Sequence, residues 1–227
     1  MKKATKRTRK MTMYEFEKKY GIHFTRNHTG KMQHLVSLST SVLCNPYCEI
    51  RRGIDGMVCA VCYAANMTEK LYKQMQPLLE ENTKVLTTVL IPKKDMPFLV
   101  SESGYFRFEA FGDLINEIQV ANYFNMAAAN PHMHCALWTK NPWIIRKAIA
   151  TYNLKKPRNL AIIGSAYYLN TPMAYEAFPF IDKVFTVYTR KYIRETGIEI
   201  NCGSRDCAGC GRCYENYGGR EVNEQKK

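Results

Sequence analysis

Two groups of cysteines at opposite ends of the sequence are the residues best suited to do chemistry. Cys202, Cys207, Cys210 and Cys213 follow the spacing C-x4-C-x2-C-x2-C, and the glycines between them let the backbone fold tightly around a bound inorganic core. Thiolates at such short spacings hold iron–sulfur clusters, but four thiolates also form a closed tetrahedral zinc site. The spacing therefore favours an iron–sulfur cluster and leaves zinc as the alternative.

The other group, near the N-terminus, is less compact. Cys44, Cys48, Cys59 and Cys62 follow the spacing C-x3-C-x10-C-x2-C. A total of nine cysteines is odd and argues against a fully paired disulfide framework, and clustered thiols in a reducing compartment indicate metal. A redox dithiol made of Cys59 and Cys62 is a weaker hypothesis, because it leaves the cysteines of the C-terminal group unexplained.

The ninth cysteine and the histidines are not expected to bind metal. Cys135 lies inside an apolar stretch and is predicted to be a small core residue. His34, His132 and His134 lie where predicted strands begin, whereas both cysteine groups follow predicted strands. We therefore expect structural or surface roles for these histidines.

Length and composition predict one soluble domain. The 227 residues are 46% hydrophobic, enough for one sizeable core, and no apolar run has the length of a signal peptide or a membrane span. We expect a cytoplasmic protein without a membrane partner. The net charge of +13 favours nucleic acid or another polyanion as partner, and the alternative is a solvated basic tail on an ordinary surface. Nothing in the sequence indicates the oligomeric state.

The apolar pattern alternates between strand and helix periods, which is typical of an α/β fold. Strands are predicted at residues 35–41, 105–111, 133–138, 159–165, 183–188 and 198–201. Helices are predicted at residues 14–20, 114–129, 142–152 and 189–195, with a further helix that Pro77 starts or kinks. Six β-α-β units predict a six-stranded parallel partial (β/α)6 TIM-like barrel. The predicted organisation is a basic tail and short helix (1–34), the barrel (35–201) and a cysteine-rich metal-binding segment (202–227) that ends in a disordered tail.

In a parallel barrel, the loops that leave the strands gather on one face, where active sites are found. Both cysteine groups are predicted to lie there, within a ring of polar residues from the other strand ends. The ring comprises Glu109, Gly112, Asp113, Thr139, Lys140, Ser165, Thr189 and Arg190. Gly112 could admit a ligand amine and Asp113 could pair with it, or Asp113 could instead cap a helix that begins at Leu114.

Several stretches between Ser37 and Tyr214 resemble a family of phage and mobile-element proteins, the gene product 88 family. They are VCYA, FGD, WTKNP, NLAIIGSA and CAGCGRCY, at residues 61–64, 111–113, 138–142, 159–166 and 207–214. The chain is also similar, more broadly, to radical S-adenosylmethionine enzymes. That resemblance implies a six-unit partial barrel, a three-cysteine 4Fe-4S cluster at Cys48, Cys59 and Cys62, and S-adenosylmethionine held by an acidic motif at Gly112 and Asp113. The last four cysteines resemble the ligands of an auxiliary cluster.

One departure from that pattern concerns the cysteine spacing. The usual tight C-x3-C-x2-C is absent, and the loop is closer to the longer one of the Elongator catalytic subunit; binding by Cys44 as well would close the site. The leading hypothesis is a 4Fe-4S protein resembling these enzymes, with a nucleic-acid or nucleotide substrate and Thr139, Lys140 and Ser165 also near the cofactor. The alternative is a non-enzymatic, zinc-stabilised nucleic-acid-binding protein of phage or mobile-element origin. The sequence leaves open whether the protein turns over any substrate.

Overall fold

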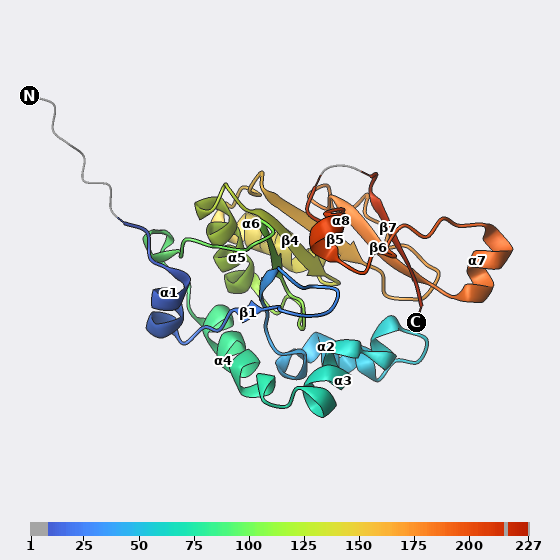
Figure 1. Ribbon diagram of the computed structural model, residues 1–227, viewed down its shortest axis with the longest axis horizontal. Coiled ribbons are helices and arrows are strands. Elements are labelled where there is room, and N and C mark those ends of the chain that lie inside the picture. Colours follow the sequence, from blue (N-terminus) through green and yellow to red (C-terminus); the bar gives the residue numbers. More distant parts are fainter. Residues whose placement is uncertain (1–8, 216–217, 227) are drawn as a thin grey trace, which may run out of the picture.

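Seven strands form one open sheet in which neighbours in the sequence are neighbours in space (Figure 1). The computed structural model describes residues 9–215 and 218–226. The strands are β1 (Thr25–Arg26), β2 (Val36–Leu38), β3 (Tyr105–Phe108), β4 (His134–Thr139), β5 (Leu160–Ser165), β6 (Lys183–Tyr188) and β7 (Glu221–Gln225). From β2 to β7 every pair is parallel, and only the two-residue β1 runs antiparallel to its neighbour. The predicted α/β class and parallel pairing are confirmed.

Helical segments connect the strands. They are α1 (Met13–Tyr20), η1 (Val42–Cys44), α2 (Pro46–Arg52), η2 (Val58–Val61), α3 (Tyr63–Asn66), η3 (Met67–Leu71), α4 (Met75–Thr88), η4 (Lys93–Asp95), α5 (Glu117–Ala129), α6 (Pro142–Tyr152), α7 (Arg190–Thr196) and α8 (Cys207–Cys210). Pro77 lies in the first turn of α4, where its missing N–H costs nothing. The predicted helices at 14–20, 142–152 and 189–195 are confirmed to within one residue.

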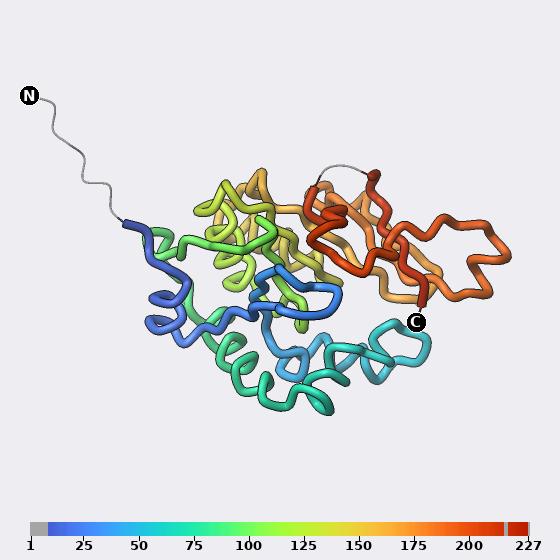
Figure 2. Tube along the Cα trace, viewed as in Figure 1, coloured from blue at the N-terminus to red at the C-terminus, as the bar shows by residue number. Residues whose placement is uncertain are grey.

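The two faces of the sheet are covered differently. On one face, Phe106, Cys135 and Leu160 form a row across β3, β4 and β5, buried in the main core together with residues of α5 and α6. On the other face, Ala136 and Ala161 pack against the C-terminal segment that carries α8. Figure 2 shows this segment, in red, crossing the sheet. Because right-handed crossovers in sequential order put the helices on one side, the other side is left for this segment.

Two predictions about the C-terminal part were wrong. Residues 198–201 do not form a strand, and residues 221–225, predicted to be a disordered tail, form β7 and pair in parallel with β6. The backbone N–H groups of Asn201 and Cys202 instead donate to the carbonyl of Asn223, at 3.1 and 3.0 Å. β7 has a mostly polar sequence, but its Val222 is fully buried. β7 thus takes the place of the sixth parallel strand that was expected at residues 198–201.

Candidate metal centres

The N-terminal cysteine group lies on short helices that follow β2. Cys44 ends η1, Cys48 lies in α2, Cys59 lies in η2 and Cys62 is the N-cap of α3. The side chain of Asn45 starts α2 by accepting a hydrogen bond from a backbone N–H two residues later, at 3.0 Å. The loop that leaves the carboxyl end of β2 thus carries this group, as predicted.

The four thiols differ in exposure: Cys48 is buried, Cys59 and Cys62 are partly buried and Cys44 is exposed. Burial raises the pKa of Cys48, and the charge of Asp113 raises it further. Cys59 and Cys62 act on Cys48 in the same direction. Burial also raises the pKa of Cys59. Cys44 differs from these three in being exposed. We call Cys48, Cys59 and Cys62 the three-cysteine group.

Arg51 is a buried cation beside the three-cysteine group. Its Nη1 lies 3.5 Å from Oδ2 of Asp113, and its Nη2 donates to Oδ1 of Asn141. Its guanidinium lies 5.2 to 5.9 Å from the ring centroids of Tyr47, Trp143 and Tyr167. Nη1 has no hydrogen-bond acceptor in the described part of the chain. Arg51 therefore ties α2 to the ends of β3 and β4, a role that no spacing rule indicated.

The residues predicted to bind a cofactor lie together at the ends of β3, β4 and β5. Thr139 Oγ1 donates to Asp113 Oδ1 at 2.6 Å, and the backbone N–H of Lys140 donates to Oδ2 at 3.0 Å. Lys140 Nζ donates to Ser165 Oγ at 2.7 Å. Their polar groups bind one another, so the set is already preorganised without a ligand.

Gly112 is required by contacts within the chain. A Cβ atom at this position would lie 2.4 Å from Oε2 of Glu109 and 2.5 Å from Oγ1 of Thr40. Both distances are shorter than any real contact between such atoms. The absent side chain therefore makes room for the carboxyl group of Glu109.

Asp113 does not cap a helix, so that alternative was wrong. The predicted helix start at Leu114 is three residues early, because α5 begins at Glu117 and its N-cap is Asn116. Asp113 instead accepts hydrogen bonds from Thr139 at the end of β4 and from the backbone N–H of Lys140, and it pairs with Arg51. A ligand amine would have to compete with Arg51 for this carboxylate.

Glu109 is a buried carboxyl group that follows β3, four residues before Asp113. Its Oε2 accepts from the backbone N–H and the hydroxyl of Thr40, at 3.2 and 3.1 Å. Its Oε1 accepts from Nε2 of Gln119 at 2.7 Å and is hydrogen-bonded to the hydroxyl of Tyr123. Burial raises the pKa of Glu109 to about 8, so the carboxyl group is mostly neutral at pH 7.

The C-terminal cysteine group, Cys202, Cys207, Cys210 and Cys213, is held on tight turns. Asp206 caps α8, because its carboxylate accepts hydrogen bonds from the backbone N–H groups of Ala208 and Gly209, at 2.9 and 3.0 Å. Gly211 ends α8 with a φ of 61°, which favours glycine. The backbone N–H of Cys207 donates to the carbonyl of Lys31 at 2.8 Å, which anchors α8 to the loop before β2.

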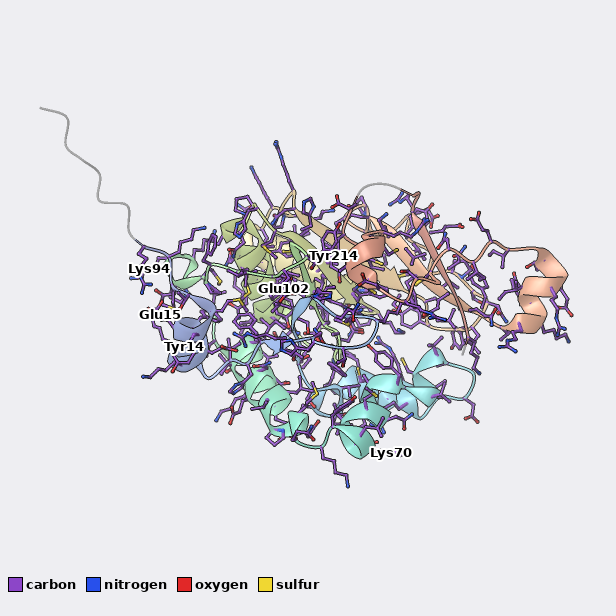
Figure 3. All side chains as sticks on the ribbon, in the orientation of Figure 1. Tyr14, Glu15, Lys70, Lys94, Glu102 and Tyr214 are labelled. Atoms are coloured by element: carbon purple, nitrogen blue, oxygen red, sulfur yellow. The ribbon has the colours of Figure 1, made fainter. Side chains whose placement is uncertain are left out.

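All four thiols of this group line one pocket. Its other lining residues include three cations and a tryptophan: Lys31, Arg107, Arg212 and Trp138. Lys31 Nζ lies 3.4 Å from the Cys202 sulfur and 3.0 Å from a carboxylate oxygen of Glu224. Tyr214, labelled in Figure 3, lies beside α8 and stacks on Tyr105 of β3, with ring centroids 4.7 Å apart. Cationic side chains around the pocket favour an anionic occupant.

Arg107 and Trp138 both bring an unsatisfied donor to this pocket. The Arg107 guanidinium lies over the Trp138 ring, 4.5 Å from its centroid. The buried Nε of Arg107 and Nε1 of Trp138 have no hydrogen-bond acceptor among the residues that the structure describes. Burial alone lowers the pKa of Arg107, but the nearby tyrosines and thiols outweigh burial and raise it. Buried N–H groups without an acceptor are rare in proteins and point to a missing partner.

The C-terminal group does not follow a sixth strand as predicted. It packs on the open face of the sheet, where Cys207 and Cys213 contact the cluster that includes Ala136 and Ala161. Tyr63, which follows Cys62 in the chain, donates from its hydroxyl to the carbonyl of Ala110.

The thiols are not arranged around a single metal ion. No group of three or more His, Cys, Asp or Glu side chains among the described residues lies close enough to hold one. In a tetrahedral zinc site with Zn–S bonds of about 2.3 Å, the sulfurs lie about 3.8 Å apart. An iron–sulfur cluster makes a different demand, because each thiolate binds its own iron and the ligands surround a larger core. In the C-terminal group, four thiols, three cations and two free N–H donors fit such an anionic core.

Cys135 and the histidines lie where the sequence placed them. Cys135 is fully buried in the main core, which confirms its predicted role. His132 Nε2 lies 2.9 Å from the carbonyl oxygen of Leu99, and His134 lies 3.5 Å from a carboxylate oxygen of Glu215. Neither lines the pocket of the C-terminal cysteine group.

Comparisons with known proteins found no matching family model, no matching curated protein and no matching solved structure. Within residues 9–215 and 218–226, no helix is both long enough and apolar enough to cross a membrane. The residues and their geometry are therefore the only basis for a function.

Proposed function

We propose that this chain is an iron–sulfur protein similar to radical S-adenosylmethionine enzymes. In this proposal the three-cysteine group holds a 4Fe-4S cluster, the C-terminal cysteine group holds a second cluster, and the sheet is part of a six-unit partial barrel. The sequential order of six parallel strands supports the barrel, because a doubly wound sheet would reverse its strand order near the middle.

The observation that carries the proposal is the pocket of the C-terminal cysteine group. Four thiols line it together with Lys31, Arg107 and Arg212. Thiolates around an inorganic core give a net negative charge, and these cations offset it. The two N–H groups without acceptors in the described chain supply the hydrogen bonds that cluster sulfurs accept.

The three-cysteine group suits a cluster with one open position. Cys48, Cys59 and Cys62 are buried or partly buried while Cys44 is exposed, so one iron would lack a protein ligand. That position would receive S-adenosylmethionine, next to Gly112, Asp113, Thr139, Lys140 and Ser165. When bound, a 4Fe-4S cluster supplies one-electron transfer. The chain itself orients this corner through Arg51 and Asp113, whose ion pair fixes α2 against the strand ends.

For the substrate we propose a nucleic acid or a nucleotide. The net charge of +13 supports it, because Lys and Arg release counterions when they neutralise phosphates. Binding to a single-stranded oligonucleotide should weaken steeply between 50 and 200 mM salt. Binding without salt dependence would contradict this part of the proposal.

Metal analysis of anaerobically purified protein tests the proposal. We expect brown protein that contains iron and sulfide and that cleaves S-adenosylmethionine when reduced. Cys59→Ser and Cys207→Ser should each lose about half of the iron, whereas Cys44→Ser should keep all of it. Cys135→Ala is the matched control, since Cys135 lies in the core and outside both groups. Colourless protein with zinc and no iron would refute the proposal and favour a zinc-stabilised nucleic-acid-binding protein.

A further inference from the structure

The pocket of the C-terminal cysteine group contains two donors that its protein contacts leave unused. Nε of Arg107 and Nε1 of Trp138 are buried, and no described residue accepts a hydrogen bond from either. Both side chains line the pocket with the four thiols. Two adjacent unsatisfied N–H groups at one site call for a common acceptor.

Neither side chain is free to turn away from the pocket. The ring of Trp138 meets the ring of Phe185 edge-on, with centroids 4.7 Å apart, and its other partner is the guanidinium of Arg107. Arg107 also donates from Nη1 to the sulfur of Met32, at 3.7 Å. Both residues stand on neighbouring strands, β3 and β4, so the sheet fixes their backbones. The donors are therefore preorganised.

We infer that Trp138 and Arg107 donate N–H···S hydrogen bonds to the sulfur atoms of a metal centre held by the C-terminal cysteine group, and that these bonds set its reduction potential. The inference rests on the proposed function in taking this group to bind metal. Hydrogen bonds to cluster sulfurs and nearby positive charge stabilise the reduced, more negative state, so they raise the potential. Trp138 and Arg107 are positioning and tuning residues and not ligands.

The three-cysteine group also has a buried donor without an acceptor, Nη1 of Arg51, but this donor lies beside a carboxylate. Its buried cation, Arg51, is paired with Asp113 and hydrogen-bonded to Asn141, and the carboxylate of Asp113 acts on Cys48. A carboxylate near a cluster opposes reduction, whereas unpaired donors favour it. We therefore expect the C-terminal centre to have the higher potential of the two.

The test compares Trp138→Phe with Trp143→Phe in the full-length protein. The chain has two tryptophans, and Trp143 lies beside Arg51 at the other site. Phenylalanine keeps an aromatic ring but removes the N–H. We expect Trp138→Phe to make one iron–sulfur signal about threefold to tenfold harder to reduce, a shift of about 30 to 60 mV to lower potential for one electron. Trp143→Phe should leave that signal unchanged.

A second variant tests the position of the donor with the positive charge kept. Arg107→Lys replaces the fixed Nε of the guanidinium by an ammonium group at the end of a flexible stem, so it should lower the same potential, while iron and sulfide content stay at the wild-type level. If both variants retain full iron and the wild-type potential, the inference is wrong even though the proposed function stands.

A diamagnetic probe keeps the inference testable if the protein binds zinc. In zinc-loaded, ¹⁵N-labelled protein, the Trp138 indole N–H should move downfield and exchange more slowly than in the metal-free protein, and the Trp143 indole should not. This result would support the N–H···S bonds, whichever metal the purified protein contains. A Trp138 signal that does not respond to metal would overturn them.

Discussion

The two cysteine groups differ in how far the protein has already satisfied the polar atoms around them. Near the three-cysteine group, Asp113 accepts hydrogen bonds from β4 and pairs with Arg51, and Lys140 reaches Ser165. At the C-terminal group, the buried donors of Arg107 and Trp138 find no acceptor in the described chain. The first region, around the three-cysteine group, leaves one buried donor without an acceptor, Nη1 of Arg51, and this donor lies 3.5 Å from Asp113; the second region, around the C-terminal group, leaves two. The four predictions below test this difference, from the largest expected effect to the smallest.

Removal of Arg51 should have the largest effect. Arg51→Ala leaves the buried Asp113 without its cation and empties the space between three aromatic rings. The free energy of unfolding should fall by about 3 to 5 kcal/mol, measured by denaturant titration. Arg52→Ala is the matched control, because Arg52 forms a partly exposed pair with Glu69 at 3.0 Å and should cost less than about 1 kcal/mol. Equal losses in both variants would show that the pair of Arg51 and Asp113 does not stabilise the region around the three-cysteine group.

Glu109, in the first region, should make the free energy of unfolding depend on pH. Burial raises its pKa from an ordinary 4.5 to about 8, so between these values the folded protein binds a proton that the unfolded chain does not. The stability of the wild type should therefore fall as the pH rises from about 4.5 to about 8, by at most about 1.4 kcal/mol per pH unit from this group. Glu109→Gln should lose this part of the slope and become progressively more stable relative to the wild type as the pH rises. Parallel profiles in thermal unfolding at a series of pH values would contradict this expectation.

Two glycines near the two cysteine groups should respond in opposite ways to a methyl group. Gly112→Ala would bring Cβ within 2.4 Å of Glu109, so it should destabilise the protein by about 1 to 3 kcal/mol. Gly203→Ala meets nothing within 4 Å beside Cys202 and should change the stability by less than about 0.5 kcal/mol. Chemical denaturation of both variants checks the contrast, and a large loss at Gly203 would mean that the C-terminal turn is more tightly packed than its contacts indicate.

Lys31 should have the smallest effect. Lys31→Gln removes the contacts with Cys202 and Glu224, from a side chain that is 32% exposed, and should cost about 0.5 to 1 kcal/mol in the metal-free protein. Lys191→Gln on α7, where the side chain is 81% exposed, serves as the control and should change nothing measurable. A large loss for Lys31→Gln without metal would mean that contacts within the protein stabilise the C-terminal region more than the 32% exposure of Lys31 indicates.

The sequence predicted the elements whose side chains repeat with a clear period. β4, β5 and β6 and helix α6 lie where the apolar pattern placed them, because burial on one face imposes that pattern. β7 escaped detection because a polar strand at the edge of a sheet needs few apolar residues, and its partner β6 lies more than thirty residues earlier in the chain. Local pattern carries no information about such distant pairing.

The candidate sites were predictable in residue type but not in detail. Spacing identified both cysteine groups, and the strand ends identified Asp113, Thr139 and Ser165. Arg51 became a buried ion-pair partner only through contacts with three separate segments, at Asp113, Trp143 and Tyr167, which no spacing rule describes. The side chain of Asn141 makes no capping hydrogen bond at the start of α6 and is instead hydrogen-bonded to Arg51 and to the carbonyl of Leu114. Tertiary contacts overrode local preference at both positions.

Strand β7 has a neighbour on only one side within the sheet, and its other edge is covered by the backbone of Asn201 and Cys202. That cover belongs to the same stretch that presents the first thiol of the C-terminal group. Oxidation of these cysteines should therefore weaken the backbone cover on the free edge of β7. An uncovered edge strand can pair with a strand of another molecule. Damage by oxygen should then appear first as self-association of folded molecules, before the hydrophobic interior opens.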